Sequence, residues 1–180
     1  MKRAEATSHG IDAAKMSLIF SLPTEILTLL NTPRADRLTD YIMARICDKQ
    51  CCDIKKAAFF VNNPDFDCCR GVIGYHANDL EGVAVHDESF DRIARAFDAS
   101  GFNKSVKTFS SSALKKNTQE HIDLMAHAVG LENPTVFEFD LKHGNKGIFL
   151  YEQKELQEQP AHGHILITLA SLLGFCPLFF

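Results

Sequence analysis

The sequence predicts one α+β domain with an antiparallel sheet, and three observations carry this prediction. Two pairs of strand-like segments, residues 55–63 with 68–76 and residues 135–141 with 147–152, are each separated by turn residues, which indicates two hairpins. Segments with apolar residues at helical spacing precede, separate and follow these hairpins. The length of 180 residues suits a single core, because a chain of that size buries roughly 70% of its unfolded surface.

A short helix is predicted over residues 21–30, ahead of the first hairpin. Ser21 and Pro23 stand before an apolar run, as at many helix starts, and Pro33 marks its end. Residues 1–33 are therefore expected to be an N-terminal extension that carries this helix.

A second helix over residues 34–47 begins the main domain, which is expected to extend over residues 34–175. Leu38, Ile42 and Ile46 recur every four residues and so mark one buried stripe along this helix. The helix leads directly into the first strand.

The first hairpin turns at Asn63, Pro64 and Asp65, which are typical turn residues. A turn centred there places Phe60 opposite Cys69 on the neighbouring strand. The start of the first strand and the start of the second then lie at opposite ends of the ribbon.

The middle of the chain is expected to be helical, with one brief strand. Residues 87–101 predict a helix that Asp87 caps and Gly101 ends, because apolar residues recur there with a spacing of three and four. Residues 103–116 predict a short third strand followed by a polar loop. Residues 118–130 predict another helix, which a glycine closes.

The second hairpin and a terminal helix complete the chain. Gly144 and Asn145 tolerate positive φ and therefore suit the tight turn of the hairpin. A polar run over residues 152–160 is expected to cross the surface. Residues 161–175 predict a helix that is apolar on nearly every side, so it needs cover from its own sheet and from a partner.

Composition and charge exclude several classes of function. The net charge of −4, with scattered lysines, argues against direct nucleic-acid contact, which needs a concentrated positive surface. The N-terminus has no secretory signal, and the apolar C-terminal stretch is shorter than the ~20 residues that span a bilayer and is interrupted by Pro177. A cytoplasmic protein without membrane contact is therefore expected. Because the chain ends on apolar residues, residues 176–180 are expected to begin a linker to further sequence.

Five of the six cysteines fall in two groups, namely Cys47, Cys51 and Cys52, and Cys68 and Cys69. The hairpin separates the two groups by about 30 Å at ~3.3 Å per residue, so they cannot share one metal ion. A local set of Cys47, Cys51, Cys52 and His76 stays open as a metal or redox centre. Core packing is the better interpretation, because the paired CxxC spacing of strong zinc sites is missing and free cysteines are usually buried.

No recognised catalytic or cofactor motif occurs in the sequence. The glycines form no dinucleotide or phosphate-binding loop, and the motifs HExxH and GxSxG are absent. We therefore predict a noncatalytic protein without a cofactor. A thiol-dependent enzyme stays as an alternative, since six cysteines and eight histidines allow many pairings.

The order of elements resembles a GAF domain, a small sensory module related to PAS domains. The resemblance covers roughly residues 34–175 and depends on three segments: "RLTDYIMARICDKQCCDIKKAAFFV" as first helix and first strand, "TVFEFDLKHGNKGIFLYE" as closing hairpin, and "HGHILITLASLLGF" as last helix. Residues typical of the cyclic-nucleotide-binding, bilin-binding and methionine-sulfoxide-reducing members are not matched. The resemblance implies an antiparallel sheet of five or six strands, with N- and C-terminal helices on one face and the middle helices over the other.

The resemblance also implies a function and a site. GAF domains often stand at the front of bacterial transcription activators, where they bind a small molecule or a protein partner and signal through a helical homodimer interface to an output domain. A pocket beneath the middle helices would be lined by five residues, Tyr75, His86, Phe90, Phe109 and His121. The alternatives are a cysteine-based metal or redox sensor and a thiol-dependent enzyme.

Overall fold

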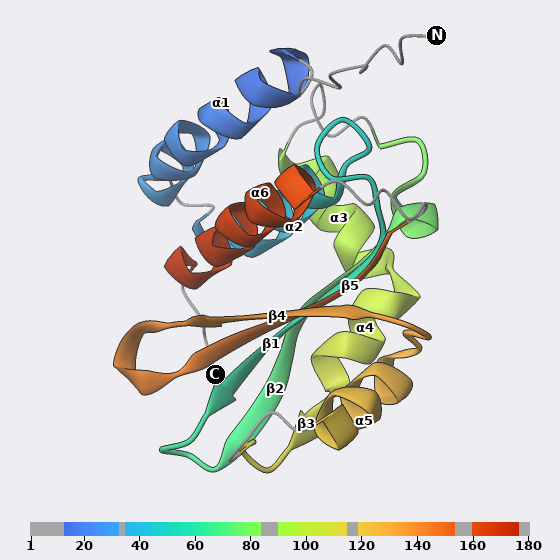
Figure 1. Ribbon diagram of the computed structural model, residues 1–180. Helices are drawn as coiled ribbons and strands as arrows, with labels where there is room; N and C mark the ends of the chain where they lie inside the picture. The colour runs from blue at the N-terminus through green and yellow to red at the C-terminus, as the bar shows by residue number, and fades with distance from the viewer. Residues whose placement is uncertain (1–12, 33–34, 84–89, 115–118, 154–159, 177–180) are drawn as a thin grey trace, which may run out of the picture.

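The fold is an open, five-stranded antiparallel sheet with six α-helices in the described part of the chain (Figure 1). The computed structural model describes residues 13–32, 35–83, 90–114, 119–153 and 160–176. The strands lie in the order β3-β2-β1-β5-β4. Their bounds are Ile54–Asn63 (β1), Cys68–His76 (β2), Ser110–Ser111 (β3), Thr135–Asp140 (β4) and Lys146–Gln153 (β5). The predicted α+β class, the antiparallel sheet and both predicted hairpins are confirmed.

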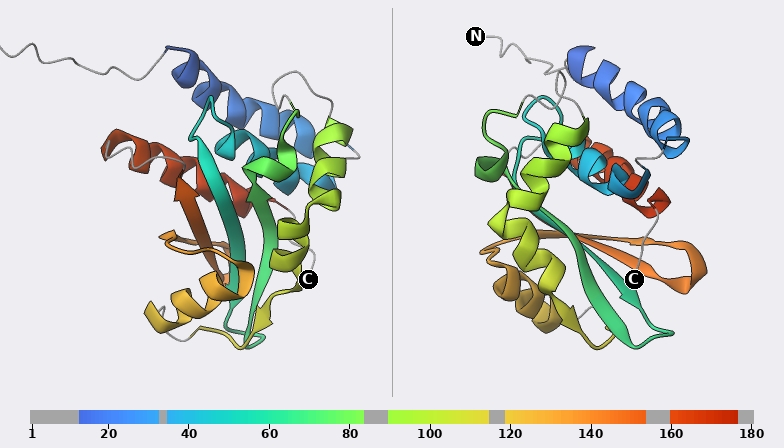
Figure 2. Two further views of the ribbon diagram at one scale, coloured as in Figure 1. Left: turned by 90° about the vertical axis from the view of Figure 1, so that its right-hand side faces the viewer. Right: turned by 180° about the vertical axis from the view of Figure 1, so that it is seen from behind.

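One face of the sheet carries the larger core and a layer of four helices (Figures 1 and 2). These helices are α1 (Ala13–Leu30), α2 (Leu38–Cys47), α3 (Phe90–Ala99) and α6 (Pro160–Ser171), and a 3₁₀ turn over Leu172–Phe175 extends α6. The core includes Ala57, Phe59 and Val61, which alternate along β1 and point to this face. Helix α2 packs against α1, α3 and α6, so it is the centre of the layer.

The opposite face carries a smaller core beneath α4 (Gly101–Thr108) and α5 (Gln119–Val129). Ala58 and Phe60 are the intervening residues of β1, and they pack with Val106 of α4 and Met125 of α5. The middle helices therefore divide between the two faces. Helix α3 joins the first face because Phe97 packs within the larger core.

The predicted third strand over residues 103–116 is wrong in its first half, where the chain forms α4. Gly101 begins this helix and does not end the previous one, because the Ser100 side chain accepts a hydrogen bond from the Asn103 N–H as an N-cap. Helix α4 lies so close to β2 that a Cβ at Gly71 would be 1.9 Å from the Val106 carbonyl oxygen. Within this segment the strand comprises only the two residues of β3.

The register of the first hairpin also differs from the prediction. Phe60 pairs with Gly71, and Asn62 is the residue opposite Cys69. The turn is tighter than predicted, because the strand pairing extends to Asn63 and Cys68. A β-bulge between Phe59 and Phe60 shifts the register further along the hairpin. The two cysteine groups nevertheless stand at opposite ends of the ribbon, as predicted.

Other boundaries shift for local reasons. Helix α1 begins at Ala13, and Pro23 lies inside it rather than at its start. In the β4–β5 turn the left-handed residues are His143 and Gly144, with φ of 60° and 74°, whereas Asn145 has φ of −70°. Asp87, the predicted cap of α3, lies outside the described residues. Among the described helices, none has the length and apolar character that crossing a membrane requires.

Candidate ligand pocket at the end of α2

A cavity of about 290 Å³ lies where α2 ends, and we call it the α2-end pocket. Its walls come from the end of α2, the loop to β1, the end of β2 and the segment that follows β2. The lining residues are Cys47, Asp48, Lys49, Asp53, Ile54, Tyr75, Ala77, Leu80, Glu81, Gly82 and Val83. Segments that are distant in sequence therefore meet at one site.

The loop after α2 holds two carboxylates at this pocket. Helix α2 ends because Asp48 leaves the helical region, with ψ of 147°. The Asp48 carbonyl then accepts N–H hydrogen bonds from Cys51, Cys52 and Asp53 at 2.9, 3.1 and 3.0 Å. Asp53 itself takes a left-handed conformation with φ of 47°. Asp48 and Asp53 are thus held on a tight, hydrogen-bonded loop.

Tyr75 is a largely buried residue in the lining of the pocket. Its side chain is 6% exposed, and its ring packs against Phe97 with the centroids 6.5 Å apart. The hydroxyl makes no hydrogen bond to any residue in the described part of the chain. Burial raises the pKa of Tyr75, and the nearby Cys47, Asp48 and Asp53 raise it further, so the hydroxyl stays protonated.

The cysteines beside the pocket are buried and do not assemble a metal site. Among the described residues, no three His, Cys, Asp or Glu side chains come together as a metal ion would require. The alternative set that the sequence left open, Cys47, Cys51, Cys52 and His76, is therefore not gathered around one point. His76 instead pairs with Asp79, with Nδ1 and Oδ1 3.3 Å apart.

Three of the buried thiols, those of Cys47, Cys69 and Cys176, lack the environment of a nucleophile. Cys47 is buried with its Sγ 3.6 Å from the Met43 Sδ, and burial raises the pKa of its thiol. Burial likewise raises the pKa of Cys69 to about 12 and that of Cys176 to about 11. Because the thiolate is the reactive form, these environments disfavour reaction. Cys51 and Cys52 form a contact pair, with the two Sγ atoms 3.6 Å apart.

The structure disperses the five residues that the resemblance places in a pocket. Tyr75 lines the α2-end pocket. Phe90 stacks on the Tyr41 ring at 5.7 Å between α3 and α2, whereas Phe109 packs edge-on against Phe60 on the opposite sheet face. His121 is exposed on α5 rather than turned inward. His86 lies outside the described residues.

The space beneath α4 is filled where the resemblance implies a pocket. A Cβ at Gly74 would lie 2.6 Å from the Val106 side chain, so α4 also packs tightly on β2 at this position. The sequence predicts Tyr75 as a residue of a different pocket, beneath the middle helices, and it does not predict Asp48 or Asp53 as site residues. Asp48 and Asp53 flank Cys51 and Cys52 in the sequence, and this position beside a predicted loop is the one sequence feature that could have indicated them.

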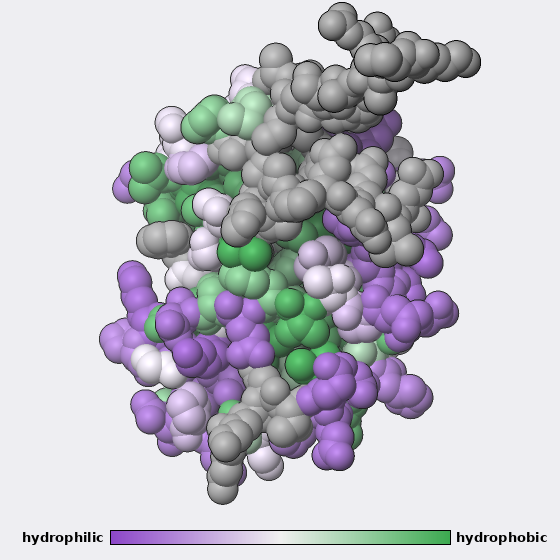
Figure 3. All heavy atoms as spheres, viewed as in Figure 1, coloured by the Kyte–Doolittle hydropathy of each residue, from purple (hydrophilic) through white to green (hydrophobic). Residues whose placement is uncertain are grey.

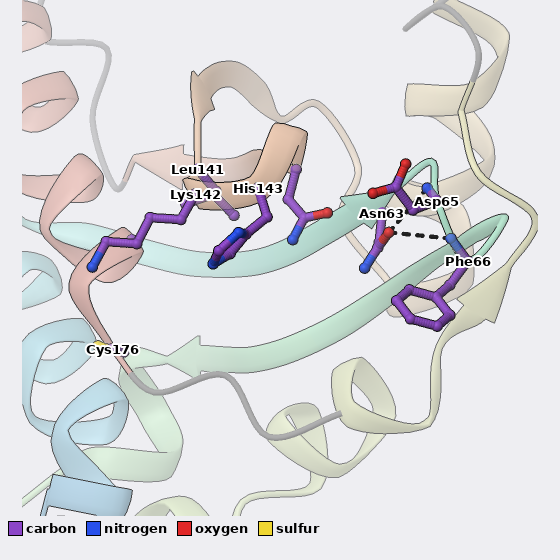
Figure 4. A pocket seen from close by; sticks show the side chains of 9 residues that line it. Asn63, Asp65, Phe66, Leu141, Lys142, His143 and Cys176 are labelled. Atoms are coloured by element: carbon purple, nitrogen blue, oxygen red, sulfur yellow. Dashed lines mark hydrogen bonds between the residues drawn. The ribbon is translucent and has the colours of Figure 1, made fainter.

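A second cavity of about 360 Å³ opens between the two hairpin turns, and we call it the hairpin cleft (Figure 4). It is lined by Asn63, Asp65, Phe66, Leu141, Lys142, His143, Asn145, Gly174 and Cys176. The Asn63 Oδ1 accepts hydrogen bonds from the N–H groups of Asp65 and Phe66, and the buried Asn145 Oδ1 has no hydrogen-bond partner. The charged groups of this cleft are exposed at turn tips. The α2-end pocket is the better candidate for the proposed function because its wall includes the end of α2, the central helix of the helical layer.

Comparison with known protein families finds no match for this chain, and comparison with curated proteins finds no relative. The case for a function therefore comes from the pocket and the helical layer.

Proposed function

We propose that this chain is a noncatalytic, GAF-like sensory domain that binds a small molecule in the α2-end pocket. It signals through a homodimer of its terminal helices and controls transcription through an output domain outside this chain. One observation carries the proposal: the end of α2 forms a wall of the pocket, and the same helix packs against α1 and α6. A ligand that displaces Cys47 or Asp48 therefore acts directly on the centre of the helical layer.

Polar contacts join α1 to α2 and support this route. The Tyr41 hydroxyl donates to the Glu25 Oε2 at 2.6 Å, and Arg45 pairs with the same carboxylate at 3.2 Å. Ser21 donates to the Glu25 Oε1 at 2.7 Å and so orients that carboxylate within α1. Hydrogen bonds to a charged group contribute about 1.5–3 kcal/mol each. A shift of α2 is thus expected to carry α1 with it.

The outer surface of the helical layer offers an apolar stripe for a second copy of the chain. Phe20 and Leu27 are 72% and 63% exposed and stand seven residues apart, on one side of α1. Ile167 is exposed on α6, and Figure 3 shows hydrophobic side chains over α1 and α6 on the same face of the molecule. Pairing two such stripes around a twofold axis would remove both from water.

Sedimentation velocity tests the dimer. Leu27→Asp should convert a dimer to a monomer, because it places a charge in the proposed interface. Leu124→Asp is the matched control, since Leu124 is 57% exposed on α5, beneath the other sheet face. A wild-type protein that stays monomeric at millimolar concentration would contradict the proposed dimer.

A thermal-shift screen with metabolites tests whether the domain binds a ligand. If no metabolite class raises the melting temperature, the result counts against the sensory role.

Redox sensing is a second candidate, and the contact between the Cys51 and Cys52 thiols favours it. Oxidation by a hydroperoxide would form one S–S bond, while the peroxide O–O bond breaks to give an alcohol and water. The sulfurs would close from 3.6 Å to about 2.05 Å and would pull the loop that carries Asp48 and Asp53. Intact mass and thiol counting after peroxide treatment should find this disulfide in wild type and in Cys68→Ser, but not in Cys51→Ser. Retention of every thiol in wild type would rule the candidate out.

A further inference from the structure

We infer that the hairpin cleft is a second binding site, which takes a small molecule whose aromatic ring carries a carboxamide group. This site is separate from the α2-end pocket, so the inference goes beyond the proposed function. It depends on two side-chain carboxamides that line the cleft with hydrogen-bonding capacity that the chain does not use, those of Asn63 and Asn145.

The register of the sheet makes these two residues neighbours. The pairing between β1 and β5 extends to Asn62 and Lys146, so the next position along the two strands sets Asn63 opposite Asn145. Residues directly opposite each other have Cβ atoms about 4.5–5.5 Å apart. Asn63 is two residues from Val61 and therefore lies on the face of the sheet that carries the larger core. The two carboxamides thus stand side by side where the sheet ends, between the two hairpin turns.

Asn63 presents a hydrogen-bond donor to the cleft. The residue is only 8% exposed, and its Oδ1 accepts the N–H groups of Asp65 and Phe66 at 3.1 and 3.2 Å. These two bonds fix the carboxamide, and they turn Nδ2 away from the backbone of the turn (Figure 4). Nδ2 makes no hydrogen bond to a described residue, so its two N–H groups can donate to an acceptor in the cleft.

Asn145 presents an acceptor to the same cleft. Its Oδ1 is buried and has no hydrogen-bond partner in the described part of the chain. The turn holds its backbone, because the Asn145 carbonyl accepts the Leu141 N–H at 2.9 Å and its N–H donates to the Lys142 carbonyl at 3.4 Å. Buried polar atoms are nearly always paired in native proteins, so this oxygen indicates a donor from outside the chain.

A carboxamide is the head group that complements both side chains. It has an acceptor for the Asn63 Nδ2 and two donors, one of which serves the Asn145 Oδ1. A carboxylate or a ketone has no donor for Asn145, and an ammonium group has no acceptor for Asn63. Rotation of the Asn145 carboxamide by half a turn would exchange its acceptor for a donor, and a carboxamide ligand could meet that arrangement as well.

The rest of the cleft suits a ring. Its volume of about 360 Å³ lies within the range of small-molecule sites, roughly 300–1,000 Å³. Phe66 lines it and is 80% exposed, and Figure 4 shows the Phe66 ring beside Asn63. Leu141 adds apolar surface from the opposite turn. An aromatic ring on the ligand would cover the exposed Phe66 ring while its head group reaches the two asparagines.

Three probes with the same ring test the inference, namely benzamide, benzoate and acetophenone. Each is titrated into the full chain near neutral pH, and the backbone amide NMR resonances of residues 65–67 and 141–146 are followed. Benzamide alone should shift these resonances at low millimolar concentration. The resonances of residues 77–83, at the α2-end pocket, serve as the internal control and should not move.

Two variants test the contacts with the head group. Asn63→Asp keeps the acceptor that holds the turn and removes the donor, so it should weaken benzamide binding about tenfold. Asn145→Leu is close in shape and should weaken binding to a similar extent. The melting temperature of Asn145→Leu should be unchanged or higher, because the replaced oxygen has no partner among the described residues.

Asn62→Leu is the matched control for stability. Asn62 is 5% exposed, and its carboxamide both donates to the Leu114 carbonyl at 3.0 Å and accepts the Leu114 N–H at 2.9 Å. This variant should therefore lower the melting temperature by several degrees. An equal loss of stability in Asn145→Leu would show that the Asn145 carboxamide supports the fold rather than a ligand, and it would overturn the inference.

The wild-type titrations decide the inference even if a variant does not fold. Equal shifts from benzoate or acetophenone would overturn the selection of a carboxamide. No shift from any probe would mean that solvent alone meets the two asparagines, and it would overturn the site. Neither result bears on the α2-end pocket, which the metabolite screen and the dimer measurements test separately.

Discussion

Asp40 should make the stability of this protein fall as the pH rises through about 6. The residue lies in the first turn of α2 and is only 5% exposed. Its Oδ2 is 2.9 Å from the Arg37 Nε, but without the alignment of a hydrogen bond. Arg37 also pairs with Asp98 at 2.6 Å, so one guanidinium serves two carboxylates. Burial therefore outweighs the charge pairing and raises the pKa of Asp40 from 3.8 to about 6.

The sign and size of the effect follow from this pKa. Because the folded-state pKa of Asp40 lies above its unfolded value, protonation of Asp40 stabilises the fold. This contribution is complete below about pH 3.8 and is lost as the pH rises through about 6. Each pH unit between the two values corresponds to about 1.4 kcal/mol, so ionised Asp40 costs about 3 kcal/mol near neutral pH. Asp40→Asn keeps the shape of the side chain and removes that cost.

Urea unfolding followed by circular dichroism between about pH 4 and pH 8 measures the effect. Asp40→Asn should raise the free energy of unfolding by up to about 3 kcal/mol near pH 7.5 and should give little gain near pH 4. Asp36→Asn is the control, since it removes a carboxylate that is exposed at the same end of the helix. The reasoning would be refuted by a variant that is less stable near pH 7.5, or by a stability difference that does not change with pH. Either result would mean that the Arg37 ion pair outweighs burial.

Two further predictions concern packing and the attachment of α1. Gly71→Ala should lower the free energy of unfolding by about 3 kcal/mol, because the new Cβ would clash with the Val106 carbonyl. Gly101→Ala is the control. A Cβ at Gly101 would have no heavy atom within 4 Å, so this variant should change the free energy of unfolding by less than about 1 kcal/mol. Thermal unfolding measures both, and equal melting temperatures would contradict the close approach of α4 to β2. Tyr41→Phe should cost about 1–2 kcal/mol and speed hydrogen exchange in α1, since it removes the hydrogen bond to Glu25. Unchanged exchange in α1 would show that this contact does not hold the helix.

The elements that sequence reasoning predicted correctly depend on local signals. The strands flank turns that contain asparagine, proline, aspartate or glycine, and α2 and α5 show regular apolar spacing. Helix α4 has a weaker pattern of apolar spacing, and the adjacent segment containing Phe109 resembles a strand. The helical conformation of α4 is stabilised by contacts with other elements. The Asn103 side chain in α4 accepts a hydrogen bond from the Gly74 N–H at 2.9 Å and donates one to the Phe97 carbonyl.

The candidate pocket was predictable only in part. Tyr75 could be placed at the end of a strand, where binding residues often lie. Asp48 and Asp53 lie on either side of the cysteine-rich loop, five residues apart, and this spacing does not indicate that both line one pocket. The loop that carries both carboxylates is held by the Asp48 carbonyl, which accepts hydrogen bonds from three N–H groups. No sequence pattern predicts this arrangement.

By itself, the sequence determined the α+β class, the two hairpins and most of the helices, because turn residues and apolar periodicity act between near neighbours in the chain. Only the tertiary structure decided the register of the first hairpin, the helical state of α4 and the separation of Phe109 from Tyr75 by the sheet. It also brought Asp48, Asp53 and Tyr75 together in the lining of one pocket. These outcomes depend on packing between residues far apart in sequence, where shape and burial decide among several locally acceptable conformations.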